Sequence, residues 1–218
     1  METRGLAKLN AKEIADLTVG GLRFFSPDQL AFLFSVGKIE LLVRNLLVQQ
    51  IAENVEMPED QAVVREWKRH DLAFLESGQP RTLFEGKAWL HSDAVSQSKL
   101  DQSADSIWAN HVGDIEKIRA TYASGLKGKA FITMILSSVN VEKINSEPRT
   151  TVSYFDTHAR GIKQSGSFEQ LRIQGNQNMV RLLETHGQVI SGELFSGEFA
   201  GAEVVADYFI LELSPESY

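Results

Sequence analysis

Two apolar segments separated by a turn, His70–Leu75 and Leu83–Leu90, constrain the fold of this chain most strongly. The residues between them are rich in turn formers, so the two segments are predicted to be neighbouring strands of a hairpin. Three ionisable residues interrupt these strands: Asp71 near the start of the first, and Glu85 and Lys87 within the second. Because side chains alternate along a strand, Glu85 and Lys87 are expected to share one face, with Asp71 beside them if the strands pair.

Two carboxylates and one ammonium at one point of an apolar sheet are suited to metal-dependent phosphodiester hydrolysis. Buried charge is costly unless it is paired or binds a metal. Asp71 and Glu85, with water and a substrate phosphate, would give Mg²⁺, or Mn²⁺ as its substitute, the oxygen ligands it prefers. Lys87 would orient the attacking water or offset the developing charge. The structural alternative is an Asp at a strand end and an exposed cross-strand Glu/Lys pair.

These residues resemble the motif of the PD-(D/E)xK nuclease superfamily, with Asp71 and Glu85-Gly86-Lys87 at the motif positions and His70 where the motif has proline. The resemblance implies a restriction-endonuclease-like α/β/α core, with a mixed central sheet flanked by helices, over about residues 38–139. It also implies a Mg²⁺-dependent DNA endonuclease acting on double-stranded DNA. The segment Asp114–Ile118 resembles the Asp-x-x-Lys-Leu/Ile pattern on the helix that follows the metal-binding strand in many members of the superfamily.

A second Glu-x-Lys sequence, Glu66-Trp67-Lys68, follows Asp60 by six positions. Its surroundings are charge-rich and typical of a helix end or a strand entrance, and Asp60 follows Pro58-Glu59 as a helix cap would. Neither half of this second motif lies in an apolar strand, so we reject it as the site.

From residue 38 to residue 139 the predicted elements have the order helix, strand, strand, helix, strand, which is the order that the resemblance implies for the core. Helices are predicted over 11–19, 26–36, 38–53, 106–123 and 168–185, and further strands over 130–139, 150–155 and 204–213. The segment 38–53 is apolar on nearly every side, which indicates burial in a core or in a subunit contact. Glu40 within it either forms an i,i+4 ion pair with Arg44 or points into the site of Asp71 as an auxiliary carboxylate.

Length and composition favour one domain, residues 1–218, with N-terminal helical and C-terminal α/β additions to the core. The absence of cysteine, of a long apolar run and of a charged-then-apolar leader predicts a protein that is not in a membrane and is cytoplasmic. The net charge of −7 excludes a global basic footprint, so any DNA surface must be local. Lys99 and a predicted basic loop over 156–163, with His158, Arg160 and Lys163, are the candidate phosphate contacts.

Cleavage of a duplex requires attack on two antiparallel strands, which favours a homodimer with two-fold symmetry. The helix 38–53 and the strand 208–213 offer apolar surface for such a contact, although the core of one chain could bury both. The alternative function is a non-enzymatic interaction or assembly protein, either with the same fold and an inactive site or with an unrelated acidic α/β scaffold.

Overall fold

The computed structural model of the chain describes residues 9–37, 39–96, 107–125, 128–144 and 151–213. In these ranges, one mixed sheet contains six strands: β1 (Gln61–Trp67), β2 (His70–Glu76), β3 (Gln79–Leu90), β4 (Lys129–Val139), β5 (Gln188–Phe199) and β6 (Ala202–Leu213). Seven α-helices are described: α1 (Ala11–Leu22), α2 (Pro27–Val36), α3 (Glu40–Asn54), α4 (His91–Val95), α6 (Ile107–Ala123), α7 (Phe155–Ser165) and α8 (Phe168–Glu184). No helix in these ranges has both the length and the apolar character needed to cross a bilayer.

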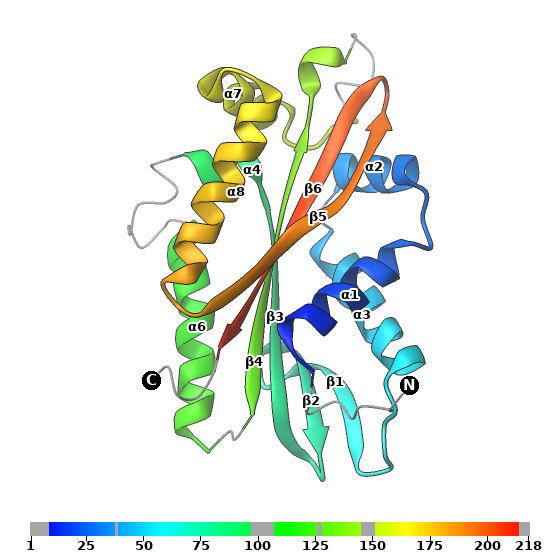
Figure 1. Cartoon of the computed structure of the whole chain (residues 1–218), viewed down its shortest axis with the longest axis vertical. Helices are drawn as coiled ribbons and strands as arrows, with labels where there is room; N and C mark the ends of the chain where they lie inside the picture. Colours follow the sequence, from blue (N-terminus) through cyan, green and yellow to red (C-terminus); the bar gives the residue numbers. More distant parts are fainter. Residues whose placement is uncertain (1–8, 38, 97–106, 126–127, 145–150, 214–218) are drawn as a thin grey trace.

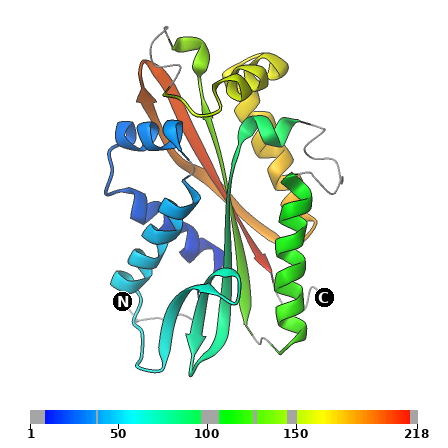
Figure 2. The same cartoon turned by 180° about the vertical axis from the view of Figure 1, so that it is seen from behind.

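The sheet has the strand order β1-β2-β3-β4-β6-β5. Strands β1, β2 and β3 form an antiparallel meander, β3 and β4 are parallel, and β6 is antiparallel to both β4 and β5. A parallel pair needs a crossover connection, and the segment carrying α4 and α6 supplies it. Helices α1, α2 and α3 lie on one side of the sheet and α6 and α8 on the other (Figure 1, Figure 2). The prediction of an α/β fold with a mixed, helix-flanked sheet is confirmed.

Side-chain caps fix where the first helices begin. Ser26 accepts a hydrogen bond from the Gln29 amide, and the Gln29 side chain accepts one from the Ser26 amide, which completes a capping box ahead of Pro27. Asn10 and Glu13 form the same reciprocal arrangement at α1. These local bonds satisfy amides that would otherwise have no partner. The predicted start of α2 at the Ser-Pro pair is therefore confirmed.

Strand β4 is the centre of the core because apolar side chains cover both of its faces. Every residue of β4 after Lys129 is buried. On the α3 side, β4 contributes to a cluster that includes Leu47, Ile51, Leu72, Phe84 and Phe131. On the α6 side, the cluster includes Ile115, Ile118, Met134, Leu136 and Met179. The strand predicted over 130–139 thus lies inside the sheet, between β3 and β6.

The prediction for residues 150–163 is wrong in the described part. Residues 151–154 form a turn in place of a strand, and the expected basic loop is helix α7. Tyr154 has φ 59° and starts the helix in a left-handed conformation, although its β-branched and aromatic neighbours favour a strand by composition. His158 and Ile162 are both buried, and their separation of four residues is the spacing of one helix face. The loop prediction instead assigned His158 to the solvent as a cation.

The two segments predicted to supply dimer surface are used within the single chain. Helix α3 is not buried on all sides: Val43, Leu47 and Ile51 form its buried stripe, whereas Leu41 is exposed. Residues 208–213 belong to β6, which pairs with β4 along one edge and with β5 along the other. Their backbone hydrogen bonds are therefore made inside the sheet.

A buried polar network ties α8 and the start of α4 to the sheet. Arg172 on α8 donates two hydrogen bonds to Asp207 on β6, at 2.8 and 2.6 Å. His91 Nε2 lies 3.0 Å from Asp207 Oδ2, and His91 Nδ1 lies 3.1 Å from the Ser138 hydroxyl. Burial alone would raise the pKa of Asp207, but the hydrogen bonds from Arg172 and His91 hold it well below its ordinary value.

We predict that Arg172→Ala lowers the free energy of unfolding by about 2–3 kcal/mol at neutral pH, because it leaves a buried carboxylate without its main partner. The pKa of Asp207 is lower in the folded than in the unfolded chain. The stabilisation by Arg172 is therefore present above the ordinary Asp pKa of about 4 and is lost as the pH falls below it. Urea unfolding at neutral and acidic pH measures this effect. Arg181→Ala, which removes an exposed arginine from the same helix, is the control, and an equal loss in both variants would contradict the prediction.

Candidate active site

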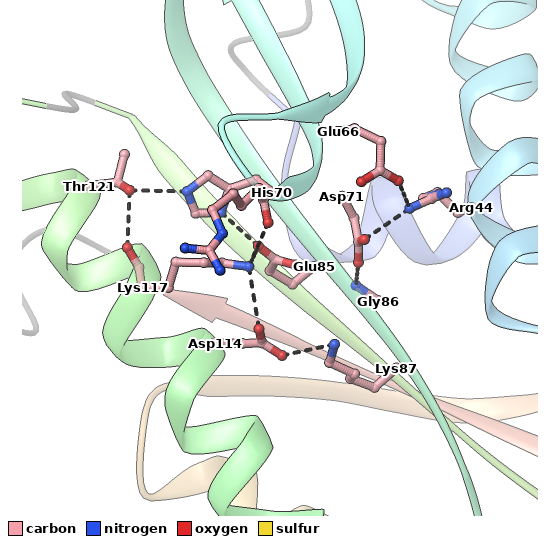
Figure 3. Close-up of polar contacts among 11 residues, drawn as sticks. Arg44, Glu66, His70, Asp71, Glu85, Gly86, Lys87, Asp114, Lys117 and Thr121 are labelled. Atoms are coloured by element: carbon pink, nitrogen blue, oxygen red, sulfur yellow. Dashed lines mark hydrogen bonds and ion pairs between the residues drawn. The ribbon is translucent and has the colours of Figure 1, made fainter.

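The candidate site lies at the edge of β3 that β2 leaves open. The last pair between these strands joins Leu72 to Phe84, whereas β3 continues to Leu90 with β4 as its partner on the opposite edge. Beyond Phe84 the backbone of β3 would lack a partner on this side, and Asp71 fills part of the gap. Its Oδ2 accepts a hydrogen bond of 2.8 Å from the Gly86 amide (Figure 3). Charged side chains from both faces of β3 are therefore close enough to interact around this open edge.

The first residues of β2 do not follow strict alternation, and this changes the predicted site. Leu72 and Phe84 pack together on the α3 side, so alternation would place Asp71 and Glu85 on the α6 side. Instead, His70 lies next to Glu85, and the Asp71 side chain points toward Arg44 on α3. Asp71 makes no direct contact with Glu85 or Lys87 in the described structure, so the predicted convergence of all three on one spot is corrected.

Glu85 forms the buried centre of the α6 side of the site. Its side chain is 2% exposed, and Oε1 lies 2.7 Å from His70 Nδ1 and 2.5 Å from Lys117 Nζ. The other ring nitrogen of His70 lies 3.0 Å from the Thr121 hydroxyl, which in turn donates to the Lys117 carbonyl. Glu85 is thus held between β2 and α6 by two basic side chains. Both of its contacts use the same carboxylate oxygen.

Lys87 and Glu85 both contact α6, which confirms that they share one face of β3. Lys87 Nζ lies 3.1 Å from Asp114 Oδ2, and Lys117 Nζ lies 3.4 Å from the other oxygen of the same carboxylate. Asp114 and Lys117 are the Asp and the Lys of the Asp-x-x-Lys segment noted in the sequence. Their spacing of three residues puts them on one helix face, directed at β3 (Figure 3).

Glu40, at the start of α3, lies on the other side of the same strand. A Cβ built on Gly86 would be 3.8 Å from both Glu40 Cγ and Asp71 Oδ2, so the two acids flank this glycine. The alternative ion pair between Glu40 and Arg44 is not formed, because Arg44 Nη1 binds Asp71 at 2.9 Å and Glu66 at 2.6 Å. Glu66, part of the rejected second motif, is 66% exposed.

The electrostatics couple Glu40, Asp71 and Lys87 although none of these three touches another. Burial raises the pKa of Glu40; the charge of Lys87 opposes this effect and the charge of Asp71 adds to it. Burial would lower the pKa of Lys87, but Asp114 together with Glu40 and Asp71 raises it above its ordinary value. The site therefore combines a carboxyl group that resists ionisation with a lysine that is firmly protonated.

The four predicted DNA-contacting residues have different outcomes. His158 is 2% exposed, burial and the neighbouring His91 charge lower its pKa to about 4, and it accepts a hydrogen bond from the Val139 amide. Its prediction as a phosphate contact is corrected, because a buried and neutral ring presents no charge to DNA. Arg160 and Lys163 are exposed on α7, and their role stays a prediction. Lys99 lies outside the described residues.

No set of three or more His, Asp or Glu side chains in the described ranges is arranged to hold a metal ion. The remaining possibility is a site with one or two carboxylates completed by water and substrate, which Mg²⁺ accepts. A pocket of about 420 Å³ lies elsewhere, between α8 and the β5–β6 hairpin, and includes Asn176, Glu193 and Asp207 in its lining. Asp207 there already binds Arg172 and His91.

Sequence reasoning missed the cationic partners of the site. Arg44 was considered only as a partner of Glu40, and His70 only as a departure from the family motif. Arg44 lies 27 positions from Asp71, and Lys117 lies 32 positions from Glu85, so only the fold brings each pair together. The one usable signal was the Asp-x-x-Lys spacing of Asp114 and Lys117.

Comparison of the chain with protein-family models, with curated proteins and with solved structures found no match.

We predict that Asp71→Asn lowers the pKa of Glu40, because it removes a neighbouring negative charge and releases Arg44. Titration of the Glu40 carboxyl carbon by NMR would measure the change. Asp114→Asn is the matched control: it should lower the pKa of Lys87, whose main charged partner is Asp114, and leave Glu40 nearly unchanged. A Glu40 pKa that is the same in wild type and Asp71→Asn would show that these two acids are not coupled.

Proposed function

We propose that the chain is a Mg²⁺-dependent DNA endonuclease with a restriction-endonuclease-like core. The observation that carries the proposal is the charged cluster at the open edge of β3, where Glu40, Asp71 and Lys87 interact electrostatically in an otherwise apolar sheet. The element order supports it: α3 precedes the β2–β3 hairpin, and α6 connects β3 to the parallel strand β4. Apart from β1, which lies between α3 and β2, and the short helix α4 after β3, this is the order of helix, hairpin, helix and strand implied by the motif resemblance.

The residues present fit a magnesium ion better at Glu40 and Asp71 than at the predicted pair of Asp71 and Glu85. Glu40 and Asp71 flank Gly86; burial raises the pKa of Glu40 and the charge of Asp71 adds to this effect, so a divalent cation would relieve the repulsion between the two carboxylates. Glu85 is buried and one oxygen of its carboxylate already binds His70 and Lys117, so a metal ion there would lie close to the positive charge of Lys117. Glu85 is thus better suited to holding Lys117 in position on the α6 side of β3.

The proposed mechanism assigns one task to each part of the cluster. Glu40 and Asp71, which flank Gly86, would hold the metal. When bound, Mg²⁺ polarises the phosphoryl group and lowers the pKa of an attacking water. Lys87 is kept protonated by Asp114, so it offsets the negative charge that develops on the phosphate and does not act as a base.

One observation favours the alternative of a protein with this fold and an inactive site. Arg44 already neutralises Asp71, and Lys117 already neutralises Glu85. Such internal pairs are also found in purely structural clusters. Metal binding distinguishes the two functions, since an inactive site would not respond to Mg²⁺. The proposal includes a homodimer because a duplex has two antiparallel strands to cut; no contact in the described structure is the basis for it.

We predict that millimolar Mg²⁺ or Mn²⁺ raises the melting temperature of the wild-type protein by about 2–4 °C, because an ion that binds only the native state stabilises it by mass action. Asp71→Ala and Glu40→Gln should each abolish most of this rise. Glu116→Ala removes an exposed acid from α6 and should retain the full response. The same rise in all four proteins would remove Glu40 and Asp71 from any metal site.

We predict that Lys87→Ala reduces plasmid cleavage at least about a hundredfold, as expected when a charge-stabilising group is removed from a transition state. The metal-dependent rise in melting temperature should persist, because Lys87 is not a ligand. Lys12→Ala, which removes an exposed lysine of α1, provides the comparison for nonspecific effects of charge. Full cleavage by Lys87→Ala would exclude this residue from the mechanism.

A further inference from the structure

The turn between β1 and β2 is strained, basic and adjacent to the candidate site. Glu66, Lys68 and Arg69 have φ values of 56°, 44° and 75°, a left-handed conformation that non-glycine residues adopt at a cost. His70 and Asp71 follow directly in the chain. The hairpin therefore holds an unfavourable backbone conformation at the residues that lead into the site.

Three contacts hold this turn in place. Lys68 Nζ lies 4.7 Å from the centre of the Trp67 ring, a cation–π contact that positions its ammonium group. The Trp67 ring stacks on His70 with 6.3 Å between the ring centres. Lys117, which binds Glu85 and Asp114, also donates a hydrogen bond of 2.9 Å to the Arg69 carbonyl. The backbone of the turn is thus attached to the same lysine that links the acids of the site.

The side chains of this turn present positive charge to solvent. Arg65, Lys68 and Arg69 are all exposed. Within the described structure, Lys68 and Arg69 form no ion pair, and Arg65 binds only the neutral amide of Asn45. The one acid among them, Glu66, shares Arg44 with Asp71, so the three cations of the turn face a single carboxylate. In a chain of net charge −7, these are cations whose charge is not offset by a bonded carboxylate.

We infer that the β1–β2 turn, through Lys68 and Arg69, binds the phosphodiester backbone of the DNA that enters the candidate site. This inference rests on the proposed function, since it places the DNA next to Asp71 and Gly86. A strained turn held by Trp67 and Lys117 presents its two cations in a fixed position, so less conformational entropy is lost when a phosphate binds. Lysine and arginine contacts to phosphate fix the position of DNA without reading its sequence.

The arrangement also explains how an acidic protein would direct DNA to one place. Helix α7, with Arg160 and Lys163, lies toward one end of the long axis and the β1–β2 hairpin toward the other (Figure 1). The turn is the basic surface that is connected by a hydrogen bond to the residues around Glu85. From Arg69 the chain continues through His70 to Asp71, which binds the Gly86 amide, so a phosphate bound by Lys68 and Arg69 would lie two residues along the chain from an acid of the site.

The test measures binding of a labelled duplex DNA by fluorescence anisotropy in EDTA, in a Lys87→Ala background so that no cleavage occurs. Lys68→Gln with Arg69→Gln should weaken binding about tenfold and reduce the slope of log affinity against log salt by about two, one unit for each lost phosphate contact. Lys12→Ala with Arg23→Ala removes the same charge from exposed positions of α1 and its end and should change neither value. Melting curves of both double variants establish that each is folded.

Equal binding by the two double variants, or the absence of DNA binding by the parent protein, would overturn the inference. The proposed function fails separately, when wild type and Asp71→Ala respond equally to metal or when Lys87→Ala cleaves like wild type. If cleavage proves absent but the two glutamine substitutions still weaken DNA binding and lower the salt slope, the turn is a DNA-binding element of a protein without nuclease activity. If cleavage is present and these substitutions have no effect on binding, only the role of the turn is rejected.

Discussion

The hydrogen bond from the Gly86 amide to Asp71 is the interaction on which the site depends. A strand edge left without a partner carries amide and carbonyl groups that must be satisfied. Strand β2 leaves β3 after the Leu72–Phe84 pair, and a side-chain carboxylate takes over the role of its backbone. This substitution opens the edge of β3 and at the same time fixes a negative charge there. Arg44, Glu40 and Lys87 are then arranged around that charge.

Much of the fold follows from features that are local in the sequence. Three local patterns each specify an element without help from distant residues: the Ser26 cap, the turn-rich connection between β2 and β3, and the doubly apolar segment of β4. The prediction failed at 150–163, where β-branched composition competed with a helical spacing of buried residues. His158 decided the outcome there, because a histidine can be a surface cation or a buried neutral ring, and only its packing distinguishes them.

The site was predictable in its residue types and much less so in its geometry. Strand alternation correctly placed Glu85 and Lys87 on one face, since both lie in the regular part of β3. Alternation failed for Asp71 because the chain enters β2 from two residues with left-handed φ values. The pairing of Arg44 with Asp71 and of Lys117 with Glu85 could not be predicted, since each of these cations comes from a helix whose distance from the hairpin depends on the complete fold.

The charges of the site are distributed so that its two faces perform different tasks. On the α6 face, Glu85 is 2% exposed and binds His70 and Lys117 through one carboxylate oxygen. On the α3 face, burial raises the pKa of Glu40 and the charge of Asp71 adds to this effect, so a cation bound there would relieve the repulsion between the two carboxylates. A buried cluster becomes costly when a charge lacks its partner. The balance between these faces therefore makes the α3 side the place where a metal and a phosphate would gain most.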